Sequence, residues 1–204
     1  MARRGASLYT LRTLLYIFPS NIREDAIPQR PKSPAPREAG LDAIGPVSGL
    51  AERLREPACL VGVGNPLRRD DGVGPWIVGA VRGALSGTHV TLFDAQDVPE
   101  NFVHAIARAD CRNVIFIDAV AAPGPPGTIV FGPLAGFPEA EGFSTHRLAL
   151  SLSGRFLESA GKAVFLLGIV PADLAFGAGL SEPVARAAET VRDLLRRMAR
   201  SARP

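Results

Sequence analysis

The chain has 204 residues, of which 47% are hydrophobic and 21% are charged, and this composition excludes a protein that is disordered throughout. Its net charge of +3 lies entirely in residues 1–57, which carry nine Lys/Arg against six Asp/Glu. Residues 58–204 are therefore balanced. No nucleic-acid partner is expected, because a neutral body does not attract a phosphate backbone.

Residues 1–45 are interpreted as a low-order N-terminal extension, to which no function is assigned. Their apolar stretch at 7–19 is interrupted by Arg12 and is not followed by a small-residue cleavage site, so the pattern does not favour a signal peptide. The rest of the segment is rich in Pro and charged residues, as flexible linkers are. One folded domain is expected over 46–204. Since no apolar run reaches the length of a membrane span, we expect a cytoplasmic protein without a membrane partner.

The expected domain alternates between strand-like and helical patterns of apolar residues. Short apolar runs predict strands at 59–63, 89–94, 114–118, 128–131 and 163–170. Amphipathic spacing predicts helices at 47–56, 71–85, 99–109, 145–160 and 181–201. The fold class is therefore α/β, a three-layer α/β/α sandwich in which helices cover both faces of a mostly parallel sheet of about five strands.

Two elements of this pattern carry more specific expectations. The strand at 128–131 follows its predecessor after a Pro/Gly loop that is too short for a helical crossover. It is therefore expected to run antiparallel or to lie at an edge of the sheet. The helix at 145–160 is predicted from Leu148, Leu152 and Phe156, which recur at helical spacing.

The loop after the first strand, within LVGVGNPLRRDDGVG (60–74), is where ligand chemistry is expected. Gly62 and Gly64 allow the backbone to turn tightly and leave room for an approaching group. A dinucleotide-binding loop would need a third glycine at the position of Leu67. Two aspartates also stand where a pyrophosphate would need the positive end of a helix dipole. The loop therefore does not predict a dinucleotide cofactor.

Three side chains are candidates for a shared metal site: Asp71 after the first strand, Asp118 at the end of the third, and His146 before a later helix. In a doubly wound sheet, ligands bind beyond the carboxyl ends of the strands where the winding reverses. The two carboxylates would face one crevice there, and a buried carboxylate is unfavourable unless it is paired or metal-bound. Such a donor set suits a divalent ion such as Ni²⁺ or Zn²⁺, with positions left open for another ligand.

Each candidate also has a purely structural interpretation. Asp70 is assigned to capping the helix and Asp71 to the metal, but spacing alone does not distinguish these two neighbours. Asp118 could instead accept a hydrogen bond from a loop amide, and His146 could bond to the backbone at the start of its helix. The pattern leaves these alternatives open.

Other catalytic devices are missing from the sequence, which contains neither HExxH nor GxSxG. Cys59 and Cys111 form no CxxC motif and lie near no histidine in sequence, so both are interpreted as inert. A hydrolase with this sequence would not be of the serine, cysteine or HExxH type. The adjacent Arg68 and Arg69 either form a surface pair or contact an acidic part of the substrate, and the surface interpretation is favoured.

The chain resembles the hydrogenase maturation endopeptidases in five motifs that occur in the same order and with similar gaps. These are GVGNPLRRDDGVGPWIV (62–78), DAQDVPENF (94–102), VIFIDAV (114–120), STHRLALS (144–151) and GIVPADLAFGAGLS (168–181). The resemblance runs from about residue 47 to the end, and VPENF is most similar to the branch that serves hydrogenase-3-type enzymes. It implies a five-stranded α/β/α sandwich with one antiparallel strand.

The resemblance also implies an activity. It is that of an aspartic-type, nickel-dependent endopeptidase, which removes a short C-terminal extension from the [NiFe]-hydrogenase large-subunit precursor once nickel has been inserted. In the family, the second acid of the loop pair, the acid that ends the third strand and the later histidine contact the metal. Here they are Asp71, Asp118 and His146, expected as the catalytic and metal-binding residues. Asp94, at the end of the second strand, is expected either to contact these ligands or to contact the substrate.

Nickel is expected to arrive with the precursor, other divalent cations are expected to be able to replace it, and the enzyme is expected to be a monomer. The alternative is a non-hydrolytic nucleotide- or metal-binding regulatory module on the same scaffold. Replacing Asp71 and His146 by alanine distinguishes the two, because only a protease would lose precursor processing.

Overall fold

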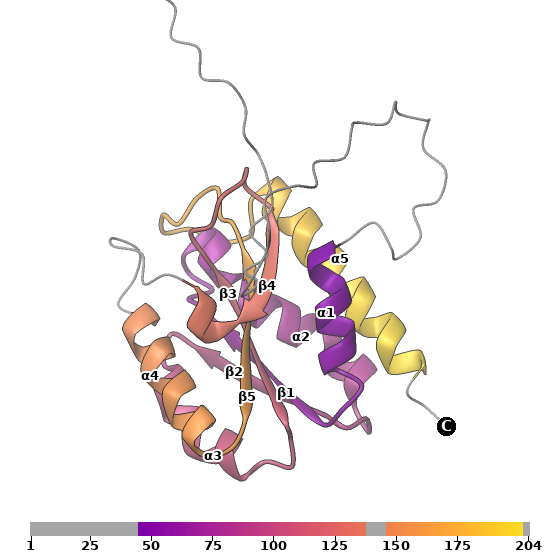
Figure 1. Ribbon diagram of the computed structural model, residues 1–204. Coiled ribbons are helices and arrows are strands. Elements are labelled where there is room, and N and C mark those ends of the chain that lie inside the picture. Colours follow the sequence, from indigo (N-terminus) through magenta and orange to yellow (C-terminus); the bar gives the residue numbers. More distant parts are fainter. Residues whose placement is uncertain (1–44, 138–145, 202–204) are drawn as a thin grey trace, which may run out of the picture.

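The computed structural model describes residues 45–137 and 146–201, which form a central sheet with α-helices on both faces (Figure 1). The predicted three-layer α/β/α sandwich is confirmed. Residues 1–44, nearly all of the expected N-terminal extension, lie outside the described residues, so that interpretation stays a prediction. Within the described ranges, no helix combines the length and apolar character needed to cross a bilayer.

The sheet has five strands in the order β2-β1-β3-β5-β4. They are β1 (Ala58–Val63), β2 (Val90–Gln96), β3 (Asn113–Ala119), β4 (Ile129–Pro133) and β5 (Ala163–Ile169). Neighbours pair in parallel except β4, which lies at an edge and runs antiparallel to β5. The short loop before β4 thus leads to an antiparallel edge strand, as predicted, because a parallel pair would need a longer crossover.

Helices lie on both faces of this sheet. One face is covered by α1 (Gly45–Arg53), α2 (Val73–Leu85) and α5 (Glu182–Ser201). The other face is covered by α3 (Val103–Arg108) and α4 (His146–Ser159) (Figure 1). Successive β-strand side chains point to opposite faces, so adjacent residues of β1 and β3 belong to different cores. Leu60 and Ile115 pack with the first group of helices, and Val61 and Phe116 with the second.

Three short 3-10 helices complete the described elements: η2 (Arg69–Gly72), η3 (Pro99–Phe102) and η4 (Leu134–Gly136). The helix predicted from residue 71 therefore begins as a 3-10 turn before α2. The predicted helix at 99–109 is likewise divided between η3 and α3. η3 begins at Pro99 and takes up the first four residues of the predicted helix, and α3 has the next six.

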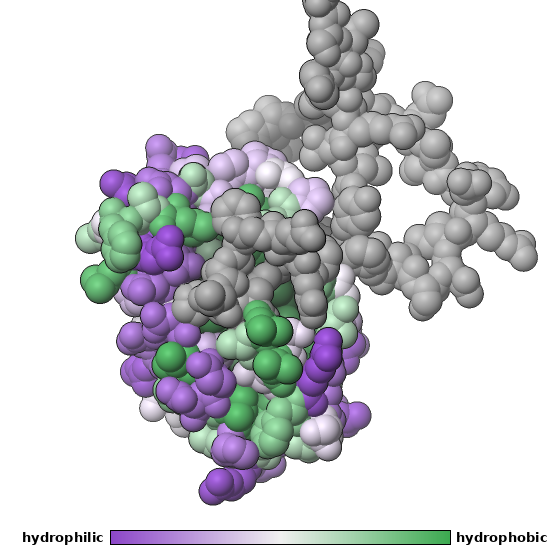
Figure 2. Space-filling model, turned by 90° about the vertical axis from the view of Figure 1, so that its left-hand side faces the viewer, coloured by the Kyte–Doolittle hydropathy of each residue, from purple (hydrophilic) through white to green (hydrophobic). Residues whose placement is uncertain are grey.

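The helix predicted at 145–160 is present as α4, but the residues that predicted it lie on its outer face. Leu148, Leu152 and Phe156 are exposed by 66%, 56% and 39%, whereas Leu150 and Leu157 are buried. Figure 2 views the side of the molecule where α4 lies, and apolar atoms are visible there between polar ones. The inner face of α4 has small residues that allow close packing, since a Cβ atom on Gly154 would lie 2.4 Å from Cδ2 of Leu134.

Close contact between β1 and α2 depends on two glycines. A Cβ atom on Gly62 would lie 2.6 Å from the main-chain oxygen of Gly74. A Cβ atom on Gly74 would lie 2.2 Å from the oxygen of Ile117 and 2.3 Å from that of Val63. The first turn of α2 therefore rests directly on the ends of β1 and β3, with no room for a side chain.

Replacing Gly74 by alanine is expected to lower the free energy of unfolding by about 2–3 kcal/mol or more, because the methyl group must displace main-chain atoms. Gly79→Ala in the same helix is the matched control, since nothing lies within 4 Å of a Cβ atom there. That change is expected to raise stability by up to about 1 kcal/mol through helix propensity. Denaturant unfolding measures both, and equal effects would contradict the close contact.

Candidate active site

The candidate site lies at the carboxyl ends of β1 and β3, the two neighbouring strands at which the winding of the sheet reverses. The chain leaves β1 at Val63 and passes through a short loop into η2, which carries Asp70 and Asp71. Asp118 is the last residue but one of β3. These elements bring carboxylates that are far apart in sequence to the same end of the sheet.

Asp71 is 9% exposed and its carboxylate faces the loop that follows β1. Its Oδ2 accepts a hydrogen bond from the backbone N–H of Asn65 at 2.9 Å. The Asn65 side chain in turn donates to Asp97 and accepts a bond from the N–H of Leu67. No described residue hydrogen-bonds Oδ1 of Asp71, so this oxygen can serve an external ligand.

Gly64 brings Asp71 and Asp118 close to one another. Its φ of +117° is in the region that favours glycine. A Cβ atom at this position would lie 1.8 Å from the main-chain oxygen of Asp71 and 3.6 Å from Oδ1 of Asp118. Asp118 is 5% exposed, so both acids of the predicted site flank Gly64 in a largely buried setting. The structure thus brings together two of the three predicted residues.

His146 is the first residue of α4, but its side chain lies outside the described residues. Its role as the third ligand therefore stays a prediction. Across 45–137 and 146–201, no group of three or more His, Cys, Asp and Glu side chains is arranged to hold a metal ion. Asp71 and Asp118 supply the oxygen donors of the predicted set, and these suit a divalent cation when a nitrogen or sulfur donor joins them.

Asp70 does not cap the helix, contrary to the expectation from sequence, because no side-chain cap bond is formed at η2 or α2. It is fully buried and accepts four hydrogen bonds from the segment after β5. The donors are the backbone N–H groups of Ala172, Asp173 and Ser181 and the hydroxyl of Ser181, at 2.6–2.9 Å. Burial alone would raise the pKa of Asp70, but these bonds outweigh it and lower the pKa.

The two arginines before Asp70 are at least partly exposed, in keeping with a surface pair, and both also hold the same segment in place. Arg68 donates from Nε to the oxygen of Leu174, and Arg69 forms an ion pair with Asp173 at 3.3 Å. Backbone bonds join Arg69 and Leu67 to Gly177 in both directions. Sequence reasoning missed this loop contact because no periodicity or motif links two irregular segments about a hundred residues apart.

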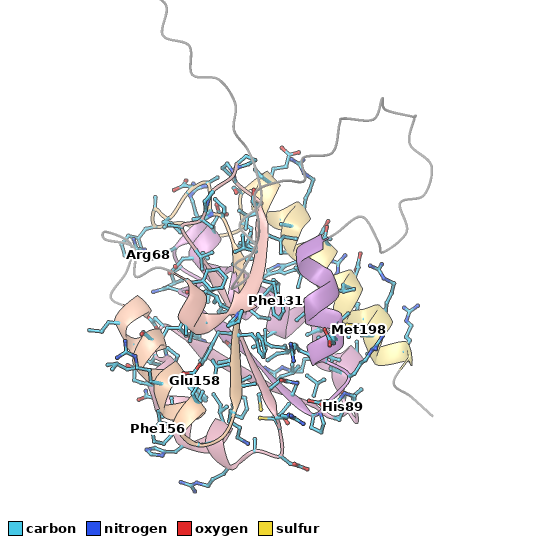
Figure 3. The ribbon with its side chains drawn as sticks, in the orientation of Figure 1. Arg68, His89, Phe131, Phe156, Glu158 and Met198 are labelled. Atoms are coloured by element: carbon cyan, nitrogen blue, oxygen red, sulfur yellow. The ribbon has the colours of Figure 1, made fainter. Side chains whose placement is uncertain are left out.

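Asp94 lies within β2, where it pairs with Gly62, and its Oδ1 is buried without a hydrogen-bond partner among the described residues. Its role toward a substrate stays a prediction. A cavity of about 520 Å³ is lined by Leu60, His89 and Met198 among others. Figure 3 shows His89 and Met198 at the opposite end of the molecule from Arg68, so this cavity is not part of the candidate site.

Comparison with known families and proteins distinguishes a peptidase from a non-hydrolytic regulatory module. The family model described as HycI, hydrogenase maturation protease, matches residues 80–197. The chain belongs to the hydrogenase maturation protease family. It is therefore a peptidase, and the non-hydrolytic regulatory module is not supported. The match covers Asp118 and His146 and begins after Asp71.

Individual relatives agree with this membership. The chain is 31% identical to the Hydrogenase 3 maturation protease of Escherichia coli K12 over 133 residues, which cover 65% of this chain and 84% of that relative. A crystal structure of the Hydrogenase 3 maturation protease matches with a TM-score of 0.60 at 28% identity, covering 69% of this chain and 89% of its own. The [NiFe] hydrogenase maturation protease HycI of Thermococcus kodakarensis KOD1 shares the fold, with a TM-score of 0.66, 23% identity and coverage of 74% and 99%.

In this maturation protease, Asp70→Asn is expected to lower the free energy of unfolding by about 2–4 kcal/mol near neutral pH, because an amide replaces an acceptor that serves four donors. Asp71→Asn, next to it, removes an acceptor of one bond and is expected to cost about 1 kcal/mol. Urea unfolding of both variants measures the difference.

The cost of Asp70→Asn is also expected to depend on pH. The pKa of Asp70 is lower in the folded protein, so its carboxylate contributes stability above the ordinary carboxyl pKa. That contribution is lost as the pH falls through the lowered value. The difference between wild type and Asp70→Asn should therefore shrink on going from neutral pH to about pH 3. A constant difference would contradict the assignment.

Proposed function

We propose that this maturation protease removes the C-terminal extension from the large-subunit precursor of a [NiFe]-hydrogenase after nickel insertion. Membership of the family supports the class of reaction and of substrate. The observation that carries the proposal is the meeting of Asp71 and Asp118 beside Gly64, at the end of the sheet where α/β proteins bind ligands. A monomer that acts in the cytoplasm, without nucleic-acid or membrane partners, is part of the same proposal.

The precursor carries the nickel, held by its own cysteine thiolates, and the protease recognises the loaded ion. Asp71, Asp118 and His146 supply the additional oxygen and nitrogen donors. The free Oδ1 of Asp71 supports this, because the carboxylate keeps its orientation through Oδ2 while the other oxygen faces a ligand. Because the precursor carries the ion, the three donors engage it only when the precursor is bound.

Two chemical routes are compatible with these donors. Asp71, Asp118 and His146 would hold the nickel of the precursor beside the scissile carbonyl, where it would supply polarisation of that carbonyl or a lower pKa of an attacking water. Alternatively, the carboxylate of Asp71 or Asp118 accepts the proton of that water, which makes the enzyme an aspartic-type peptidase in which nickel serves recognition. The meeting of both acids beside Gly64 supports the second role, because a general base must lie within hydrogen-bond reach of the water that it activates.

Asp71→Asn, Asp118→Asn and His146→Gln are each expected to lower precursor processing by about a hundredfold or more, the loss typical of a missing acid–base or metal-binding group. Incubation with purified nickel-loaded precursor, followed by mass spectrometry of the released extension, measures the rate. Asp193→Asn on α5 is the control, because this half-exposed carboxylate bonds to its neighbour Arg192 and to none of the three site residues. Full activity of the Asp71 and Asp118 variants would contradict the assignment.

Processing is expected to require nickel in the precursor. The same precursor prepared without nickel should release no extension, because the donors of the protease would have no ion to bind. Reloading it with nickel should restore cleavage, and loading with Zn²⁺ or Co²⁺ tests whether other divalent ions can substitute. Cleavage of nickel-free precursor at the same rate would show that recognition rests on the polypeptide alone.

A further inference from the structure

The two cysteines of the chain, Cys59 and Cys111, meet outside the candidate site. They are separated by 52 residues in sequence, yet their sulfur atoms lie 2.8 Å apart. Both are free thiols, with 0% and 6% of their surface exposed. They are also the only cysteines among the 204 residues, so any disulfide within one chain must join them.

The backbone holds this pair in place. Cys59 lies in β1, opposite Val114 of the parallel neighbour β3, and Cys111 lies in the turn that leads into β3. That turn is bound to the start of β1, because the N–H groups of Arg112 and Asn113 both donate to the oxygen of Pro57. The contact between the sulfur atoms therefore follows from the pairing of two central strands and does not depend on a mobile side chain.

The surroundings make one sulfur the better nucleophile. The Cys59 thiol donates toward the sulfur of Cys111, and the ammonium group of Lys162 donates to the main-chain oxygens of Ala109 and Cys111. The hydrogen bond from Cys59, aided by the charge of Lys162, lowers the pKa of Cys111 to about 7 despite its burial. The same contact raises the pKa of Cys59. Cys111 is thus the thiol that loses its proton first, and Cys59 the one that keeps it.

We propose that Cys59 and Cys111 form a site of reversible oxidation, at which a small hydroperoxide converts the two thiols into an intramolecular disulfide. The Cys111 thiolate attacks the peroxide, the O–O bond breaks, and the sulfur is oxidised to a sulfenic acid as the other oxygen leaves and takes up a proton. The Cys59 sulfur then attacks the Cys111 sulfur. An S–S bond forms, the S–O bond breaks, and water leaves with the Cys59 proton.

Little movement separates the thiols from the bond. A disulfide has its sulfur atoms about 2.04 Å apart, so the two sulfurs must approach by roughly 0.8 Å. The bond would join the amino ends of β1 and β3, and it would close a long loop in the unfolded chain. Since Asp71 and Asp118 lie at the other ends of these strands, oxidation stabilises the fold without touching the candidate site.

The test treats the purified full-length chain with hydrogen peroxide and then alkylates it after unfolding. The expected product is a monomer that has lost the mass of two hydrogen atoms and has no thiol left to alkylate, both reversed by a reductant. Its unfolding midpoint is expected to rise by about 10 °C. Oxygen-bearing cysteines, a disulfide between two chains, or two thiols that remain free would each overturn the proposal.

Single substitutions separate the roles of the two sulfurs. In Cys59→Ser, peroxide is expected to leave Cys111 as an oxygen-bearing acid, because the hydroxyl can still donate to the Cys111 sulfur but no second thiol is present to complete the bond. In Cys111→Ala, Cys59 is expected to stay unmodified, because its thiol is protonated and buried. The double variant, treated in the same way, controls for methionine oxidation in the unfolding measurement. A rise in its midpoint equal to that of the wild type would contradict a disulfide as the cause.

Discussion

The buried carboxylate of Asp70 is the interaction on which the geometry of the candidate site depends. It accepts four hydrogen bonds from residues 172–181, which lie between β5 and α5. These bonds attach that segment to the loop after β1. Because β3 lies between β1 and β5 in the sheet, this link crosses the carboxyl end of β3, where Asp118 stands. A single side chain thereby fixes residues 172–181 beside the candidate site.

The same interaction orients the neighbouring acid. Asp70 and Asp71 lie in a 3-10 turn, in which successive side chains diverge by about a third of a turn. With Asp70 directed to residues 172–181, the Asp71 carboxylate is directed to the backbone N–H of Asn65. Two chemically identical neighbours thus have different tasks. One is saturated with hydrogen bonds and stabilises the fold, and the other keeps an oxygen available for a ligand.

Glycines make the approach of these elements possible. Gly62 and Gly74 let α2 rest on the ends of β1 and β3, and Gly64 lets the backbone of η2 pass within contact of the turn. Any Cβ atom at these positions would overlap main-chain atoms, which cannot move aside as flexible side chains do. The proposed nickel-recognition site and the proposed disulfide lie at opposite ends of β1 and β3. The carboxyl ends of these strands hold the site, and their amino ends hold the two cysteines.

Much of this architecture could be predicted from the sequence, because it follows from local pattern. The spacing of apolar residues predicted the five strands and the main helices. The short loop before β4 predicted that this strand runs antiparallel or lies at an edge. The loop glycines and the acids after β1 and β3 indicated the region of the site, since parallel strands place their carboxyl ends together.

The tertiary structure distinguishes residues that the local sequence pattern cannot tell apart. Neither spacing nor residue type distinguishes Asp70 from Asp71, since the difference arises from donors on a loop about a hundred residues away. The stripe of Leu148, Leu152 and Phe156 is as helical as the one formed by Leu150 and Leu157, and only packing against the sheet selects the second for burial. Cys59 and Cys111 meet because two strands pair in one register. The sequence alone determines which segments become strands, whereas long-range pairing determines which side chains become neighbours.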